Sequence, residues 1–155
     1  MTTPDELLSD VLKRRAAEPG ALLPILHELQ DALGFIPPEA VPRIAVALNL
    51  SRAEVHGVVS YYHHFREHKP GRHVVQVCRA EACKSMGADA LLAHAEARLG
   101  CKQHESTADG QFTLEPVFCL GLCSSSPAMM LGDDLHARMT PARFDALISE
   151  ARSKA

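Results

Sequence analysis

Four cysteines, arranged as two pairs, constrain the fold of this 155-residue chain more than any other feature. Cys78 and Cys83 have four residues between them, and Cys119 and Cys123 have three. Residues 84–118 separate the pairs, so a site that uses all four thiols requires a fold that brings the chain back after 35 residues.

Each cysteine pair follows a predicted strand. Residues 73–77 form an apolar strand that runs into Cys78, and residues 111–118 form a second strand that runs into Cys119. Residues 87–99 between them have the apolar spacing of an amphipathic helix. Because a strand–helix–strand unit is parallel with a right-handed crossover in nearly all cases, both pairs are expected at one edge of the sheet. That edge is where open α/β sheets bind their ligands.

The rest of the second half completes a small α/β domain. Residues 128–131 and 135–139 flank a Gly-Asp-Asp turn and predict a hairpin, and residues 141–151 predict a final helix. This order of elements is that of a thioredoxin-like fold. Pro116 has no backbone N–H, so it favours an edge position or a strand end for residues 111–118.

The first half predicts four short helices. The segments Thr3–Glu6 and Ser51–Glu54 are capping boxes, which start the first and the fourth helix. The second and third helices cover about residues 21–33 and 38–48. None is long enough to be stable alone, so the four are expected to bundle. The apolar side of the fourth helix consists of Val55, Val58, Val59 and Tyr62.

The turn Lys69-Pro70-Gly71 separates these two halves. We therefore predict an N-terminal helical domain at residues 1–69 and a thioredoxin-like domain at residues 70–155. The fold class is α+β, a helical bundle followed by a thioredoxin-like α/β domain.

Composition excludes several classes of function. The net charge of −3 does not suggest a nucleic-acid-binding protein. No apolar run reaches the length of a membrane span, and the acidic N-terminus lacks the apolar core of a signal peptide. A cytoplasmic location is therefore expected. Thiols stay reduced there, so clustered cysteines indicate metal or redox chemistry rather than structural disulfides.

Three kinds of site suit four thiols in this pattern. They are an iron–sulfur cluster, a structural zinc ion and redox-active or structural disulfides. Structural zinc sites often use tighter loops with two residues between the cysteines, whereas two irons that each need two thiolates suit wider loops. The spacing favours the cluster and leaves the other two open. Cys101 is excluded as a ligand, because it follows a helix about 20 Å long that starts near Cys83 and runs away from it.

Several neighbours of the cysteines could tune such a site. The charges of Arg79 and Glu81 could shift a reduction potential, although solvated loop charges are the simpler interpretation. The run Ser124–Ser126 could donate hydrogen bonds to sulfur, or could simply lead into Pro127. Thioredoxin-like folds commonly have a cis proline at this position, and the sequence leaves the isomer open.

The whole pattern resembles the thioredoxin-like [2Fe-2S] ferredoxin family. That family includes the 24-kDa subunit of NADH:quinone oxidoreductase and relatives in NAD-linked hydrogenases and formate dehydrogenases. Besides the cysteine pairs, the resemblance rests on residues 26–37 and on residues 54–65, Glu-Val-His-Gly-Val-Val-Ser-Tyr-Tyr-His-His-Phe, in which Ser60 and Tyr61 replace the usual threonine and phenylalanine. Residues 78–88 look most like the gamma subunit of soluble NAD-dependent formate dehydrogenases.

The resemblance implies an electron-transfer subunit that has no active site of its own. Its one [2Fe-2S] cluster would be held by Cys78, Cys83, Cys119 and Cys123, and no side chain would have a catalytic role. The implied partners are a flavin- and NAD-binding iron–sulfur subunit and a larger catalytic subunit. FMN, NAD and a molybdenum or tungsten cofactor are expected on those partners alone.

Formate dehydrogenase is the expected enzyme, and the equivalent subunit of respiratory NADH:quinone oxidoreductase or of an NAD-linked hydrogenase is the alternative. A different class of function also stays open: an interaction module that is stabilised by a zinc ion bound to the four cysteines.

Overall fold

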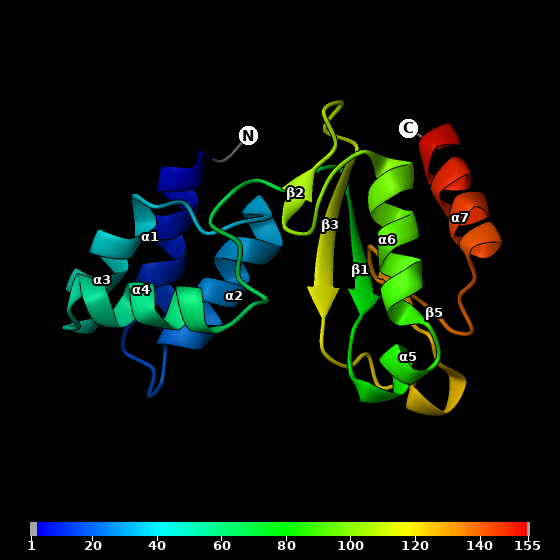
Figure 1. Cartoon of the computed structure of the whole chain (residues 1–155). Helices are drawn as coiled ribbons and strands as arrows, with labels where there is room; N and C mark the ends of the chain where they lie inside the picture. Colours follow the sequence, from blue (N-terminus) through cyan, green and yellow to red (C-terminus); the bar gives the residue numbers. More distant parts are fainter. Residues whose placement is uncertain (1–2, 155) are drawn as a thin grey trace. The chain divides into compact units, whose positions relative to one another are not determined.

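The computed structural model describes residues 3–154 (Figure 1). The chain divides between Lys69 and Pro70 into two compact units, which we call unit 1 and unit 2. Among the described residues, each helix falls short of the length and apolarity that a bilayer span requires.

Unit 1 contains four helices around a shared apolar core. They are α1 (Pro4–Arg15), α2 (Leu22–Leu33), α3 (Ala40–Leu48) and α4 (Arg52–Tyr61). Both predicted capping boxes are present, with the Thr3 and Ser51 hydroxyls accepting from the backbone N–H of Glu6 and Glu54. The predicted helical bundle is confirmed. Its fully buried side chains include Val11, Ile25, Leu26, Leu29, Ile44 and Val55.

The segment after α4 differs from the prediction. Tyr62 was expected on the apolar side of the helix, but the helix ends at Tyr61 and Tyr62 is 44% exposed with an extended backbone. The buried amide of Gln30 redirects the chain here. Its Nε2 donates to the His64 carbonyl and its Oε1 accepts from the Arg66 N–H, both at 2.7 Å. Phe65 is buried in the core instead.

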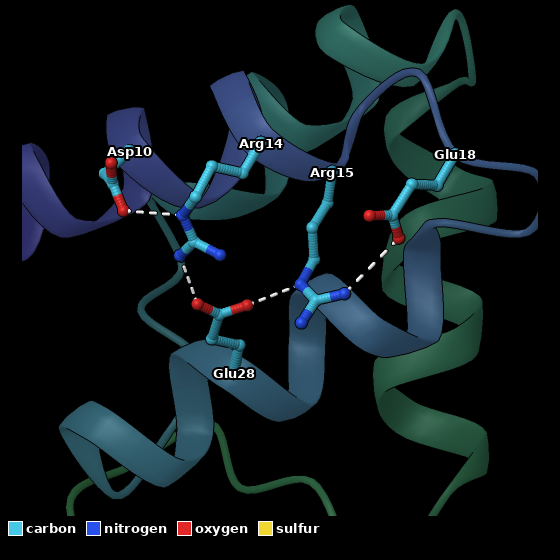
Figure 2. A network of polar contacts seen from close by, with 5 residues as sticks. All are labelled: Asp10, Arg14, Arg15, Glu18 and Glu28. Atoms are coloured by element: carbon cyan, nitrogen blue, oxygen red, sulfur yellow. Dashed lines mark hydrogen bonds and ion pairs between the residues drawn. The ribbon is translucent and has the colours of Figure 1, made fainter.

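A network of charges joins α1 to α2 (Figure 2). The carboxylate of Glu28 on α2 accepts from the guanidinium groups of Arg14 and Arg15 on α1. Arg14 also pairs with Asp10 at 2.9 Å, and Arg15 pairs with Glu18 at 3.3 Å. Hydrogen bonds from Arg14 and then Arg15 lower the pKa of Glu28 below its ordinary value of 4.5.

We expect Glu28→Gln to lower the stability of unit 1 at pH 7 by about 1 kcal/mol or less, since these side chains are partly exposed and water screens the pairs. The Glu28 pKa is depressed in the folded state. Its contribution is therefore present above the unfolded pKa of about 4.3 and is lost as pH falls through the folded value. Thermal unfolding from pH 7 down to pH 3 measures this: the difference from the parent should shrink as the pH falls. Asp31→Asn, the same loss of charge on α2, is the control, and an equal effect of both variants would contradict the prediction.

Unit 2 contains a five-stranded sheet with its helices. In chain order the elements are β1 (His73–Cys78), α5 (Glu81–Ser85), α6 (Ala88–Leu99), β2 (Glu105–Ser106), β3 (Phe112–Val117), η1 (Cys123–Ser125), β4 (Met129–Leu131), β5 (Asp134–His136) and α7 (Pro141–Ser153). The strand order is β2-β3-β1-β4-β5. Residues of the strands, α6 and α7 form one core, which includes Val75, Val77, Leu91, Phe112, Leu114, Met129, Phe144 and Ile148. The predicted thioredoxin-like α/β fold is confirmed.

β1 and β3 are parallel, as predicted, and they end in register. His73 pairs with Phe112 at one end and Cys78 pairs with Val117 at the other. Figure 1 shows both arrowheads at the same end of unit 2, where α5 also lies. The chain therefore leaves the two strands side by side, at the same edge of the sheet.

Pro116 lies near the end of β3, and the edge-strand alternative is wrong because β3 runs between β1 and β2. The Val117 carbonyl accepts from Arg79 on the β1 side, so Pro116, one residue earlier, turns its nitrogen to the β2 side. β2 pairs with Thr113 and Leu114, short of Pro116, so the absent N–H costs the sheet no hydrogen bond.

Gly71 allows the chain entering β1 to approach β3 closely. A Cβ there would lie 2.8 Å and 2.9 Å from the backbone C and N of Phe112 and 3.0 Å from the Gly110 oxygen. Backbone atoms cannot move aside cheaply, so Gly71→Ala should destabilise unit 2 by about 1–3 kcal/mol. Gly57 in α4 has nothing within 4 Å of such a Cβ. Gly57→Ala should therefore stabilise unit 1 by about 0.5–1 kcal/mol. Urea unfolding of both variants checks this, and shifts of the same sign would contradict it.

Candidate functional site

The ends of β1 and β3 bring both cysteine pairs to one edge of the sheet. Cys78 is the last residue of β1, and Cys119 comes two residues after β3 ends at Val117. The Arg79 N–H donates to the Val117 oxygen at 2.7 Å, and the Cys78 N–H donates to the Ala128 oxygen at 3.1 Å. The chain around the first pair is thus held by segments that adjoin the second.

The first pair is buried, because the chain turns back after Cys78. Cys83 was expected in a loop, but it lies in the short helix α5, in which the Lys84 N–H donates to the Ala80 oxygen at 2.9 Å. Cys78 is 1% exposed and Cys83 is 2% exposed. They share an apolar cluster with Ala88 and Ala128, flanked by Ala80, Val117, Leu120 and Leu122.

Hydrogen bonds distinguish the two buried thiols. Burial raises the pKa of Cys78 the most, and the backbone N–H groups of Ala80 and Leu120 oppose that effect without cancelling it. At Cys83 burial is again the largest single effect, but the Ser126 hydroxyl, the Ala128 backbone and Cys78 together outweigh it and lower the pKa. The Cys83 Sγ lies 3.5 Å from the Ser126 Oγ. Backbone N–H groups are therefore already directed at sulfur, whereas the Ser126 hydroxyl donates to the Cys123 carbonyl at 2.8 Å.

The second pair is exposed and closely spaced. The Sγ atoms of Cys119 and Cys123 are 3.7 Å apart, and the Gly121 N–H donates to the Cys119 Sγ at 3.3 Å. Cys119 has a φ of 119°, a conformation that costs a non-glycine residue about 1–3 kcal/mol and that clusters at functional sites. A hydrogen bond with Cys119 raises the pKa of Cys123 most, and the charges of Cys83 and Cys78 add to the rise. The two pairs therefore share one electrostatic environment.

Cys101 lies elsewhere. It is 7% exposed and belongs to the main core of unit 2 with Leu99 and Ala151, not to the cluster around Cys78. All five cysteines lie within residues 3–154, and each carries a free thiol.

Of the two charged residues that follow Cys78, one is hydrogen-bonded and the other is exposed to solvent. Arg79 donates to Asp89 Oδ1 at 3.1 Å and to Gln103 Oε1 at 3.2 Å. The simpler interpretation, a solvated loop charge, therefore does not hold for Arg79. Glu81, in contrast, is exposed. The Ser126–Pro127 bond, left open by the sequence, is cis. Sequence reasoning missed Asp89 and Gln103, because nothing in their spacing links them to Arg79.

The spacing of the exposed pair suits two thiolates on one metal ion. Thiolates on one tetrahedral metal, with metal–sulfur bonds of about 2.3 Å, lie roughly 3.8 Å apart, close to the 3.7 Å between Cys119 and Cys123. A [2Fe-2S] cluster takes four cysteine thiolates, two on each iron. The pairs and the N–H groups directed at their sulfurs suit that group.

Comparison with known proteins finds relatives both in sequence and in structure. An NADH-quinone oxidoreductase subunit of Rhizobium meliloti is 37% identical over 133 residues, 86% of this chain and 79% of that protein. An NADH-quinone oxidoreductase subunit of Aquifex aeolicus is 37% identical over 129 residues, 83% of this chain and 81% of that protein. The crystal structure of an air-oxidized NAD+-reducing [NiFe]-hydrogenase superposes with a TM-score of 0.72 at 27% identity. This match covers 92% of the present chain but 24% of the hydrogenase chain.

Residues 8–152 match the family described as Thioredoxin-like [2Fe-2S] ferredoxin. The match includes both cysteine pairs and nearly all of both units. The chain therefore belongs to the thioredoxin-like [2Fe-2S] ferredoxin family.

Proposed function

We propose that this chain is an electron-transfer subunit in which Cys78, Cys83, Cys119 and Cys123 hold one [2Fe-2S] cluster. The observation that carries the proposal is the parallel, in-register pairing of β1 and β3, which delivers both thiol pairs to one edge of the sheet. Family membership supports the same cofactor.

The chain itself supplies ligands, donors and a partial shield from water. Such a cluster, when bound, takes up and releases single electrons. Cys78 and Cys83 lie in an apolar pocket that excludes solvent, and Ser126 and the Gly121 N–H contact sulfur, as groups that tune a reduction potential do. Cys119 and Cys123 are exposed, so electrons would enter and leave on their side. No side chain is assigned acid–base work.

The proposed enzyme is a cytoplasmic NAD-dependent formate dehydrogenase. The basis is the amino-acid sequence of residues 78–88, which resembles that of the gamma subunit of this enzyme. A partner subunit would carry the flavin and the NAD site, and a larger one would carry the molybdenum or tungsten cofactor. The named relatives are subunits of NADH-quinone oxidoreductases, and the superposed structure is an NAD+-reducing hydrogenase. An equivalent place in one of those complexes is the alternative.

Metal analysis of the purified full chain tests the cofactor. We expect about two irons and two acid-labile sulfides per chain, a brown colour, and an S = ½ EPR signal after reduction with dithionite. Colourless protein with one zinc per chain would replace the proposal with a zinc-stabilised interaction module.

Affinity purification of the tagged chain from its native host, followed by mass spectrometry, tests the enzyme. A co-purifying large subunit with molybdenum or tungsten, together with NAD-linked formate oxidation, is the expected result. Nickel in the large subunit, or co-purifying membrane subunits, would assign the chain to one of the alternative complexes.

A further inference from the structure

Arg79, the residue that directly follows Cys78, carries a permanent positive charge. Its backbone N–H donates to Val117, which continues the pairing of β1 with β3. A guanidinium stays protonated at any pH a protein tolerates. The side chain is 28% exposed, so water screens this charge less than it screens the charge of an exposed residue such as Glu81.

The guanidinium is held in place. Its Nη2 lies 3.1 Å from Asp89 Oδ1, and its Nη1 lies 3.2 Å from Gln103 Oε1. Its Nε is buried and meets no hydrogen-bond acceptor among residues 3–154. Asp89 lies in the first turn of α6 and also approaches the Lys84 Nζ at 3.8 Å. The residue after Cys78 therefore belongs to a fixed pair of opposite charges, of which the positive member is the more buried.

We propose that the Arg79–Asp89 pair sets the reduction potential of this site, with Arg79 raising it and Asp89 lowering it. The inference rests on the proposed function. Reduction adds one electron, and thus one negative charge, to the group held by the four thiolates; no bond breaks and no proton is needed. A fixed positive charge nearby favours that added charge, and a fixed negative charge opposes it.

A purely structural clamp would behave differently. Arg79→Gln and Asp89→Asn break the same ion pair, so a clamp predicts similar consequences for both variants. A field effect predicts shifts of opposite sign, because the first variant removes a positive charge and the second a negative one. The sign of the two shifts therefore separates the two roles.

The test is an EPR-monitored redox titration of the full chain, loaded anaerobically with iron and sulfide and reduced with dithionite. Arg79→Gln should make reduction about tenfold less favourable, roughly 59 mV lower for one electron, and Asp89→Asn should make it more favourable. Arg79→Lys keeps the charge but not the forked contacts, and it should stay close to the parent. Arg98→Gln is the matched control. It breaks the pair of Arg98 with Asp145 at the far end of α6 and should leave the potential unchanged.

Iron content separates the possible failures. Variants that hold two irons per chain and shift in the same direction, or not at all, overturn the inference and leave the proposed function intact. A parent chain that takes up no iron overturns both. Should Arg79→Gln fail to load, Asp89→Asn and Arg79→Lys decide the question, because Asp89→Asn must still raise the potential above that of both the parent and Arg79→Lys.

Discussion

Replacing Cys78 with alanine is expected to reduce the iron content of the chain from about two atoms to near zero. Cys78 is 1% exposed, and its neighbours Ala88 and Ala128 offer no side chain that could take its place as a ligand. Water has poor access to the same pocket. The remaining three thiolates would leave one iron without its second protein ligand, and the cluster would be lost.

Iron and sulfide analysis with the EPR signal of the reduced protein measures this loss. Cys101→Ala is the matched control, since Cys101 is also buried but lies in the main core of unit 2. That variant should keep about two irons per chain. A Cys78→Ala protein with full iron content and an unchanged spectrum would remove Cys78 from the ligand set, and loss of iron from Cys101→Ala would add Cys101 to it.

Phe144→Ala is expected to destabilise unit 2 by about 3–5 kcal/mol, the usual cost of emptying a fully buried aromatic site. Phe144 on α7 has no exposed surface, and the ring of His94 on α6 lies edge-on to it with 5.8 Å between ring centroids. The cavity would open where both helices meet the sheet. For a domain of this size each kcal/mol lowers the Tm by about 4–8 °C, so a fall of at least roughly 12 °C should be seen.

Thermal and urea unfolding of the full chain test the effect. Leu135→Ala is the control, because Leu135 on β5 is 52% exposed and its truncation should change stability by no more than about 0.5 kcal/mol. If Phe144→Ala unfolded within about 1 kcal/mol of the parent, α7 would not be an integral part of the core, contrary to the structure.

The sequence predicted the elements that have strong local signals. Val75 and Val77 alternate in β1, α6 has a full apolar stripe, and the capping boxes at Thr3 and Ser51 mark where helices begin. The parallel arrangement of β1 and β3 followed from the handedness of strand–helix–strand connections. This rule was sufficient to expect both thiol pairs at one edge.

The missed elements are short or depend on distant contacts. β2 has two residues, Glu105 and Ser106, which show no apolar alternation and pair because β3 is available. α5 has five residues, fewer than any periodicity needs, and it forms where Cys83 is buried in the apolar cluster with Cys78. Tyr62 left the predicted apolar face because Gln30, 32 positions earlier, binds the backbone of the following segment.

The candidate site shows the same division. The residue types and their spacing predicted a site made of four thiols, and they showed a resemblance to one family. Neither could tell that Cys78 and Cys83 are buried whereas Cys119 and Cys123 are exposed. The Arg79 contact with Asp89 was equally out of reach, since it depends on how α6 packs beside β1. Such features follow from tertiary packing and not from local pattern.

The hydrogen bonds around Cys78 also bear on when the thiol site can form while the chain is being translated. The backbone at this position is held by Val117 and Ala128, which leave the ribosome long after Cys78 itself. Until then the first thiols belong to an unpaired strand with no fixed geometry. Insertion of the proposed cluster would therefore wait for translation past Ala128, because the first two thiols are made before the contacts that fix their geometry.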